Sequence, residues 1–400
     1  MTDHTLPSIE SIGLPLVYKV DPAQPARVPA PEAMTVLVEA RALEGMQKEA
    51  LIHHGPTNTT WRMVSDEGPY LNGTDLAPFP LAFYAVGMAF SLLSELEQHA
   101  ATREISLRSV RLEQDNYYTM QGSAIRGDMI GGALPTEIAV SIESDASPGQ
   151  IGEIVRLAES SSPAQSYMND VLRNTFSLYS NGQPVPVGDM AASNIAPLVD
   201  PAPSFEAAGP LSMDEYAAEI ITKQSVAEVV TGVEGGAGSS LKSEQKRTLH
   251  VHTEATIRKD GLREATVRLR KPIGSSFHFI SDERSELAPP SLGYLAAGVG
   301  FCYMTQLGRY AHIVKLDLGP YQIAQTNTFV AEGPDGKAVP KPVDTHLYVT
   351  LNDSDEAAQK LLWMGERTCF LHAAMRSSNR SDFSASLNGT PIELDGEPSP

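Results

Sequence analysis

Alternation of hydrophobic and polar residues marks strands along most of the chain. A period of two runs through 35–40, 105–113 and 136–143, and again through 248–257, 265–270, 313–318 and 345–351. Such alternation predicts half-buried strands. Two longer runs, 80–96 and 292–307, are apolar on all sides, follow a proline and carry Gly with Ser or Thr. They predict two central helices buried by the sheets, in preference to membrane spans.

The pattern occurs twice. Residues 77–91 resemble residues 288–302, which places Ser91 opposite Cys302, 211 positions later. A Ser-Asp-Glu turn precedes each segment, at 65–67 and 281–283. Downstream, Ser162 matches Cys369 and the Asn-Gly pair at 181–182 matches that at 388–389, both 207 positions later. Anchors in one order at nearly constant spacing predict a duplicated domain.

These matches divide the chain into four parts. Residues 1–33 form a Pro-rich N-terminal arm, 34–190 a first domain without cysteine, and 246–397 a second domain that carries both cysteines. Between them, 191–245 is a linker with an expected helix at 213–230 and a Gly-rich tract at 232–240. The tract does not stand between a strand and a helix, so a flexible linker is favoured over a phosphate-binding loop. The stretch 115–133 is expected to be a long loop of the first domain.

The composition restricts the classes of binding partner and predicts the cellular compartment. The chain of 400 residues has 49 Asp and Glu against 30 Lys and Arg, and its basic residues form no block. Nucleic acid and anionic membrane are therefore not expected partners. The N-terminal residues lack the basic and apolar stretches of a signal peptide, and two cysteines fit a reducing compartment. A cytoplasmic location is expected.

The order of strands, Ser-Asp-Glu turn, Pro-led apolar helix with Cys302 and later helix with Cys369 resembles the OsmC/Ohr superfamily of thiol-dependent hydroperoxide reductases. The resemblance implies an α+β fold in which two tandem OsmC-like domains form an intramolecular pseudo-dimer around central buried helices. It implies a monomeric pseudo-dimer or a homodimer. It also implies a peroxidase of organic hydroperoxides, which needs an apolar small-molecule substrate and a dithiol reductant but neither a cofactor nor a metal.

The resemblance assigns roles to individual residues. Cys302 matches the peroxidatic cysteine, whose thiolate becomes a sulfenic acid, and Cys369 matches the resolving cysteine. Arg258 is the best match for the cation that stabilises the thiolate, and Arg263 is the second choice. The family's glutamate before the peroxidatic cysteine is replaced by Ser-Leu at 291–292. Glu283 or Glu286 from the preceding loop is the expected substitute.

Histidines offer a different chemistry. His250 and His252 alternate along one predicted strand with Glu254, so the three side chains share a face that could bind a metal or supply a general base. No third ligand is fixed by spacing, so no metal site is expected. His372 falls one helical turn after Cys369. Two alternatives therefore stay open, a non-redox enzyme on the same scaffold that uses Cys302 and a histidine, and a non-catalytic protein that binds a small ligand.

Overall fold

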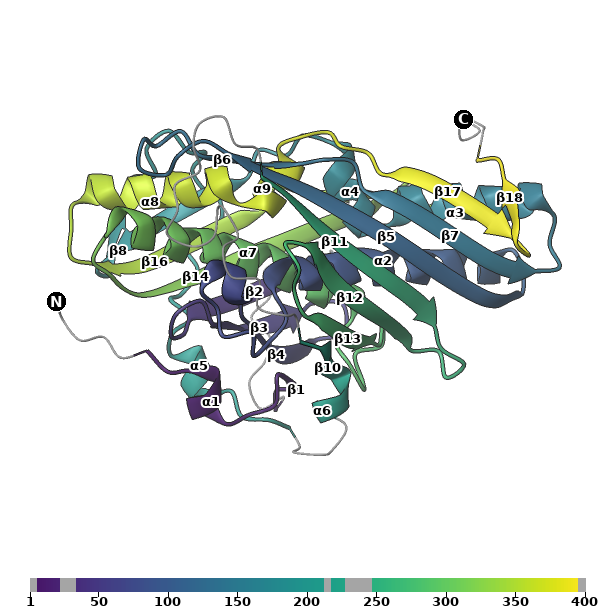
Figure 1. Cartoon of the computed structure of the whole chain (residues 1–400), viewed down its shortest axis with the longest axis horizontal. Coiled ribbons are helices and arrows are strands. Elements are labelled where there is room, and N and C mark those ends of the chain that lie inside the picture. The colour runs from purple at the N-terminus through teal and green to yellow at the C-terminus, as the bar shows by residue number, and fades with distance from the viewer. Residues whose placement is uncertain (1–5, 22–33, 212–216, 227–246, 395–400) are drawn as a thin grey trace.

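The computed structural model describes residues 6–21, 34–211, 217–226 and 247–394. Helices and strands are mixed through the whole of this part, so the fold is α+β (Figure 1). An N-terminal turn of helix and a short strand come first, α1 (Ile9–Ile12) and β1 (Val17–Lys19).

The first half of the chain runs from β2 to β9. Its elements are, in order, β2 (Met34–Ala42), β3 (Lys48–His54), β4 (Thr59–Ser65), η1 (Pro69–Leu71), α2 (Pro80–Thr102), β5 (Leu107–Gln121), β6 (Ile130–Ala133), β7 (Glu137–Ser144), α3 (Pro148–Ser161), α4 (Pro163–Asn169), β8 (Thr175–Ser180) and β9 (Gln183–Val185). The connection to the second half contains α5 (Ser204–Ala207), α6 (Ala217–Ile220) and β10 (Ile221–Ser225).

The second half, from β11 to β18, repeats the order of the first. Its elements are β11 (Arg247–Ile257), β12 (Arg263–Lys271), β13 (Ser276–Ser281), α7 (Ser291–Val314), β14 (Leu318–Glu332), β15 (Lys337–Pro340), β16 (Asp344–Leu351), α8 (Asp355–Thr368), α9 (Phe370–Met375), β17 (Asp382–Leu387) and β18 (Thr390–Ile392). Each half thus has three strands, a long helix, three strands, two helices and two strands.

The described strands form two nine-stranded sheets, and each sheet takes strands from both halves. Sheet I has the order β1-β4-β3-β2-β14-β16-β8-β9, with β15 beside β14. Sheet II has the order β10-β13-β12-β11-β5-β7-β17-β18, with β6 beside β5. The segments 34–190 and 246–397 are therefore not two separate sheets side by side. Alternation in a sequence shows that a segment is a strand, but it does not show which strand is its partner.

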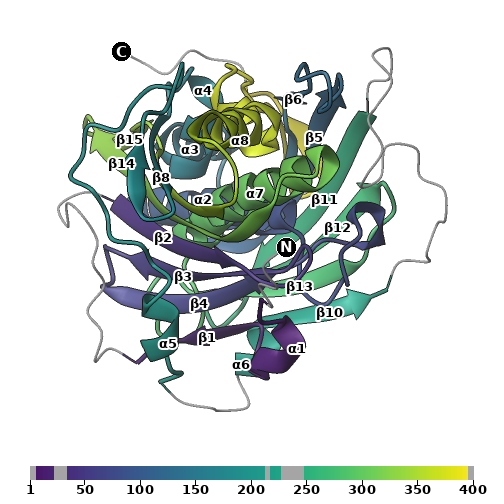
Figure 2. The same ribbon diagram turned by 90° about the vertical axis from the view of Figure 1, so that its left-hand side faces the viewer.

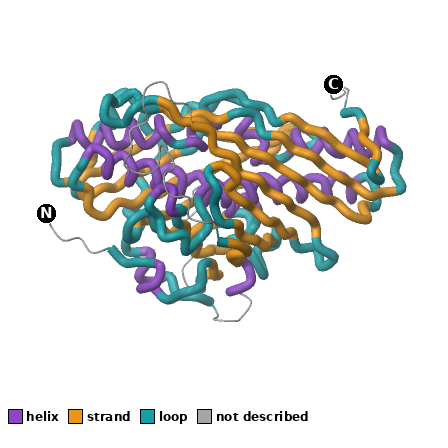
Figure 3. Tube along the Cα trace, viewed as in Figure 1, coloured by secondary structure: helices purple, strands orange, loops and turns teal. Residues whose placement is uncertain are grey.

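Helices fill the space between the two sheets. Helix α2 packs on β5, β11 and β12 of sheet II, and α7 packs on β2, β3 and β14 of sheet I. In Figure 3 the long strands of sheet II cross in front of the helices. Figure 2 shows β2, β3 and β4 between these long helices and the short helices α1 and α5 on the outer side. None of the helices in the described ranges is both long and apolar enough to span a membrane.

Two expectations about the connecting segments need correction, and the N-terminal arm carries a strand that was not predicted. The N-terminal arm contributes β1, which pairs with β4. The segment 115–133 is not a loop, because β5 continues to Gln121 and pairs with β6 through Tyr118 and Ala133. The described part of the expected helix 213–230 is the short α6 followed by β10, which pairs with β13. The Gly-rich tract at 232–240 lies outside the described residues.

The two long helices touch at a pair of glycines, which brings their backbones close together. A Cβ built on Gly87 would lie 2.5 Å from the backbone nitrogen of Leu295, and one built on Gly298 would lie 2.5 Å from that of Tyr84. No real side-chain atom fits at such distances without movement of the partner helix. The contact fixes the position of α2 relative to α7, and therefore of Ser91 relative to Cys302.

Gly298→Ala is expected to lower the free energy of unfolding by about 1–3 kcal/mol, the usual effect of inserting an atom into a packed core. Urea titration measures it. Gly293→Ala in the same helix is the matched control, because its Cβ would meet only ordinary contacts, the nearest at 3.5 Å. Equal stability of the two variants would contradict the close contact.

Candidate functional site

Cys302 and Cys369 meet inside the protein. The thiol of Cys369 donates to Sγ of Cys302 with a sulfur–sulfur distance of 3.4 Å. Cys302 is 2% exposed and Cys369 is fully buried, and both thiols are free. A disulfide requires the sulfurs to be about 2.05 Å apart, so a small local movement separates the reduced pair from a bond.

The backbone places the two sulfurs differently. Cys302 lies in the middle of α7, whereas Cys369 ends α8 and begins α9 with an extended backbone. Burial raises the pKa of the Cys369 thiol well above its ordinary value, and the hydrogen bond to Cys302 raises it further. Backbone N–H groups of His372 and Leu371 act in the opposite direction. Cys369 is therefore protonated at neutral pH.

A buried lysine from the first half of the chain interacts electrostatically with Cys302. Lys48 begins β3, is 2% exposed, and donates from Nζ to the carbonyl of Met46 at 2.6 Å. The pKa of Lys48 is lowered overall, because the effect of burial exceeds the opposing effect of the charges of Glu67, Asp66 and Cys302. This side chain is the kind of cation that stabilises a thiolate.

Glu67, in the loop after β4, links the first half to the helix of Cys302. Thr305, three residues after Cys302 on α7, donates to one carboxylate oxygen of Glu67 at 3.0 Å, and Tyr70 donates to the other at 2.7 Å. Burial raises the pKa of Glu67, and Lys48 and the two hydroxyls lower it. The thiol pair thus has a cation and a carboxylate nearby, both supplied by the opposite half.

The serines that match the cysteines are arranged in the same way. The hydroxyls of Ser91 and Ser162 are hydrogen-bonded at 2.9 Å and both are buried. Ser162 ends α3 and begins α4, as Cys369 does for α8 and α9, with nearly the same backbone angles. The chain therefore contains two equivalent sites, a thiol pair and a serine pair.

Arg263 and Glu283 accompany the serine pair, although the sequence suggested them for Cys302. Glu283 accepts a hydrogen bond from Ser94, three residues after Ser91 on α2, at 3.0 Å. Burial raises the pKa of Glu283, and the charge of Arg263 lowers it. Arg263 also pairs with Glu97 of α2 at 2.5 Å. Arg263 and Glu283 of the second half therefore lie beside α2 of the first half. In the same way, Lys48 and Glu67 of the first half lie beside α7 of the second half.

Arg258 lies on the hairpin between β11 and β12. It pairs with Asp260 at 2.7 Å and with Glu264 at 3.9 Å, and one third of its side chain is exposed. The structure thus places the first-choice cation at the surface of the second half. Lys48 instead interacts electrostatically with Cys302, because strands β2 and β3 of the first half pack on α7.

His250 and His252 lie together on sheet II. Both contact the same oxygen of Asp115 on the neighbouring strand β5, at 2.5 and 2.8 Å, and His252 lies 3.5 Å from Glu254. Among the described residues, no group of three or more His, Cys, Asp or Glu side chains is arranged to hold a metal ion.

His372 is fully buried one turn after Cys369, beside the rings of Tyr303 and Phe176 at 5.2 and 5.9 Å. Burial lowers the pKa of His372 to about 3. Its imidazole is therefore neutral at physiological pH and supplies no positive charge to the thiols.

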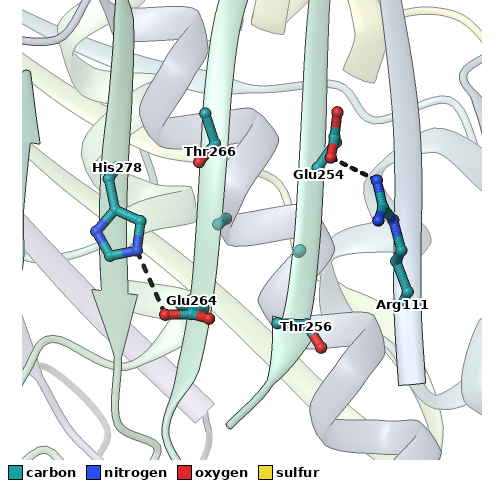
Figure 4. A pocket seen from close by; sticks show the side chains of 8 residues that line it. Arg111, Glu254, Thr256, Glu264, Thr266 and His278 are labelled. Atoms are coloured by element: carbon teal, nitrogen blue, oxygen red, sulfur yellow. Dashed lines mark hydrogen bonds and ion pairs between the residues drawn. The ribbon is translucent and has the colours of Figure 1, made fainter. Parts of the chain in front are cut away.

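A groove of about 310 Å³ lies on sheet II (Figure 4). Two ion pairs form its walls, Arg111 with Glu254 at 2.6 Å and His278 with Glu264 at 3.5 Å. The short side chains of Thr256 and Thr266 stand between them, and a helix lies behind the strands in Figure 4. The groove is polar and contains no cysteine.

Sequence reasoning missed Lys48 and Glu67. A signal was present, since Lys48 and Arg263 are 215 positions apart and Glu67 and Glu283 are 216 apart, close to the spacing of the other anchors. The sequence did not show that β2 pairs with β14 and β11 with β5. These pairings place the β2–β3 hairpin on α7 and the β11–β12 hairpin on α2.

Of the comparisons with known proteins, the search of solved structures found a similarity, over one third of the chain. No family model matches the chain, and no curated protein sequence matches it. Among solved structures, the chain is similar to the crystal structure of an OsmC-like hydroperoxide resistance protein from Jannaschia sp. CCS1. The identity is 26%, the match covers 33% of this chain and 88% of that chain, and the TM-score is 0.25. The similarity is confined to one third of the chain.

Proposed function

We propose that this protein is a thiol peroxidase that reduces organic hydroperoxides, with Cys302 as the attacking and Cys369 as the resolving cysteine. The observation that carries the proposal is the 3.4 Å approach of two free, buried thiols that lie 67 positions apart in sequence. A chain with two cysteines in total has both of them in this one contact.

The chemistry balances in two steps. The thiolate of Cys302 attacks the terminal peroxide oxygen, so that an S–O bond forms, the O–O bond breaks and the alkoxide leaves, taking up the proton that the thiol lost. Sulfur is oxidised to sulfenic acid and the hydroperoxide is reduced to an alcohol. The thiol of Cys369 then displaces water from the sulfenic acid and closes the disulfide, which a dithiol reductant opens again.

Two features favour Cys302 as the attacking thiol. The charge of Lys48 acts on Cys302, and the thiol of Cys369 donates a hydrogen bond to it, which assists the thiolate of Cys302. Burial, by contrast, keeps Cys369 protonated, as suits a resolving thiol. The surroundings are apolar and aromatic, with Phe370, Tyr303 and Tyr118 near the pair, so an apolar hydroperoxide fits best.

The chain would act as a tandem OsmC-like pseudo-dimer. Support comes from the exchange of strands between halves and from the supply of Lys48 and Glu67 across that exchange. One half keeps the thiols and the other has serines at the matching positions. Such a chain carries one active site, needs no second copy for it and works in a reducing cytoplasm.

The test is oxidation of the reduced protein with a slight excess of cumene hydroperoxide, followed by acid quench, alkylation and peptide mapping. A Cys302–Cys369 disulfide is expected within seconds, and dithiothreitol should restore both thiols. Cys369→Ser should stop at a sulfenic acid on Cys302 that dimedone traps, and Cys302→Ser should consume no peroxide.

Thiols that survive the hydroperoxide in the folded wild-type protein would exclude peroxidase chemistry. If Cys302→Ser then still abolished a native activity, the non-redox enzyme would be supported. If Cys302→Ser left the binding of a small ligand intact, the non-catalytic ligand-binding function would be supported.

A further inference from the structure

Tyr118 carries a buried hydroxyl whose role packing does not explain. The residue lies on β5, is 2% exposed, and its hydroxyl has no hydrogen-bond partner within the described part of the chain. Buried polar groups are nearly always paired, so each exception requires an explanation. A hydroxyl kept without a protein partner is available to a ligand.

Tyr118 packs beside the residue that follows Cys369. The ring of Tyr118 lies 5.6 Å from that of Phe370 between centroids, and its hydroxyl interacts electrostatically with Tyr84, Cys302 and Cys369. Tyr118 belongs to the first half, as Lys48 does. The thiols of the second half are therefore approached by two polar groups of the first half, an ammonium and a phenol hydroxyl.

The serine site lacks this hydroxyl. Tyr118 pairs with Leu249 on β11 and with Ala133 on β6. Phe329, 211 positions later, occupies the same register on β14, where it pairs with Met34 and Pro340. Its ring packs on Tyr167 of α4 at 4.7 Å. Phenylalanine therefore satisfies the packing at this position, and the hydroxyl is present only beside the thiols.

We propose that Tyr118 is a catalytic residue that donates a hydrogen bond to the peroxide oxygen that leaves as alkoxide when Cys302 attacks. The proposal rests on the peroxidase function and assigns this residue a part in the first step. As the O–O bond breaks, negative charge moves from sulfur to the leaving oxygen, and a fixed donor in a dry site stabilises it there. The alkoxide still receives the proton that the Cys302 thiol lost.

This assignment divides the work between two residues. Lys48 acts on the thiolate before attack, and Tyr118 acts on the oxygen that leaves. Burial raises the pKa of Tyr118 well above its ordinary value, so the hydroxyl remains a donor throughout the working pH range. The substrates that depend on it most are alkyl hydroperoxides, because an alkoxide is a poor leaving group. A peracid, which releases a stable carboxylate, depends on it least.

The test is Tyr118→Phe, with Cys302 oxidation measured by stopped flow. With tert-butyl hydroperoxide the rate constant is expected to fall at least about tenfold, toward the hundredfold typical of losing one oxyanion donor. With peracetic acid it should fall much less, and alkylation of Cys302 by iodoacetamide, which breaks no O–O bond, should be unchanged. Phe329→Tyr, the reverse change at the serine site, is the matched control and should leave all three rates unchanged.

The outcomes separate the alternatives. Equal loss with the alkyl hydroperoxide, the peracid and iodoacetamide would mean that Tyr118 acts on the thiolate or on the fold, and would overturn the assignment. An unchanged rate with tert-butyl hydroperoxide would overturn it as well, while leaving the peroxidase function intact. Wild-type thiols that survive peroxide would overturn both, and that result is obtained before any Tyr118 variant is made. Thermal unfolding of Tyr118→Phe should be no earlier than that of the wild type, because the removed hydroxyl has no described partner.

Discussion

Lys48→Met is expected to slow the reaction of Cys302 with hydroperoxides about a hundredfold at neutral pH, because it removes the cation that favours the thiolate, a loss comparable to that of one preorganised electrostatic group. The lysine is fully buried, so solvent screens its charge little, and its charge acts directly on Cys302. Without it, the thiolate would have to form in an apolar site with the carboxylate of Glu67 nearby. The rates of peroxide oxidation and of alkylation by iodoacetamide at neutral pH measure the effect, and both should fall.

Two controls separate this effect from a loss of folding. Arg263→Met removes the equivalent cation from the serine site and should leave the reaction of Cys302 unchanged. Lys48→Met together with Glu67→Gln removes the buried cation and a neighbouring carboxylate at once, which avoids an unpaired buried charge. Equal rates in the Lys48 and Arg263 variants would show that the cation of the opposite half has no part in the chemistry.

Patterns within single segments were readable from the sequence. Strand alternation predicted most of β7, β11, β12 and β16 and the first part of β5, and the two apolar runs predicted α2 and α7. The strand predicted at 313–318 is wrong, because α7 continues to Val314 and β14 begins at Leu318. The match of Ser91 with Cys302 and of Ser162 with Cys369 placed each pair at equivalent points of two helical segments. Both pairs are in contact, at 2.9 and 3.4 Å. These features follow from local periodicity and from internal similarity, which a single chain contains.

Pairing between distant segments was not readable. In sheet I the strands β4, β3 and β2 end at β2, and in sheet II the strands β13, β12 and β11 end at β11. Each of these two end strands could have paired with the next long strand of the same half of the chain. In the structure β2 pairs with β14 and β11 pairs with β5. Both arrangements bury the same apolar faces, so the hydrophobic pattern does not choose between them. This choice assigned Arg263 and Glu283 to the serine site and Lys48 and Glu67 to the thiols.

The same limit explains why Tyr118 escaped notice. In the sequence it is one of two neighbouring tyrosines in a stretch that was expected to be a loop. Only the extension of β5 to Gln121, with burial of alternate residues, turns its side chain inward. A contact between the first half's strand and the second half's thiols cannot be inferred from spacing along either half.

The serine site should become a second thiol site when its serines are replaced. The hydroxyls of Ser91 and Ser162 are already 2.9 Å apart. The second half supplies Arg263 and Glu283 to this site. The first half supplies Lys48 and Glu67 to the thiols in the same way. In Ser91→Cys with Ser162→Cys, the two sulfurs would stand where a disulfide can close after a small movement. Cumene hydroperoxide should therefore convert four thiols to two disulfides, and peptide mapping should find positions 91 and 162 joined only in the double variant.

The engineered pair should react more slowly than the native one. Phe329 stands where the native site has Tyr118, so the leaving oxygen would lack its donor, and Arg263 is shared with Glu97. Adding Phe329→Tyr is expected to raise the oxidation rate of the engineered pair about tenfold if the hydroxyl acts as one oxyanion donor. The larger sulfurs cost about 1–3 kcal/mol of stability in so tight a site, which urea titration would reveal. Engineered thiols that stay reduced in a folded protein, while the native pair is oxidised, would show that the surrounding charges of the serine site do not support thiol chemistry.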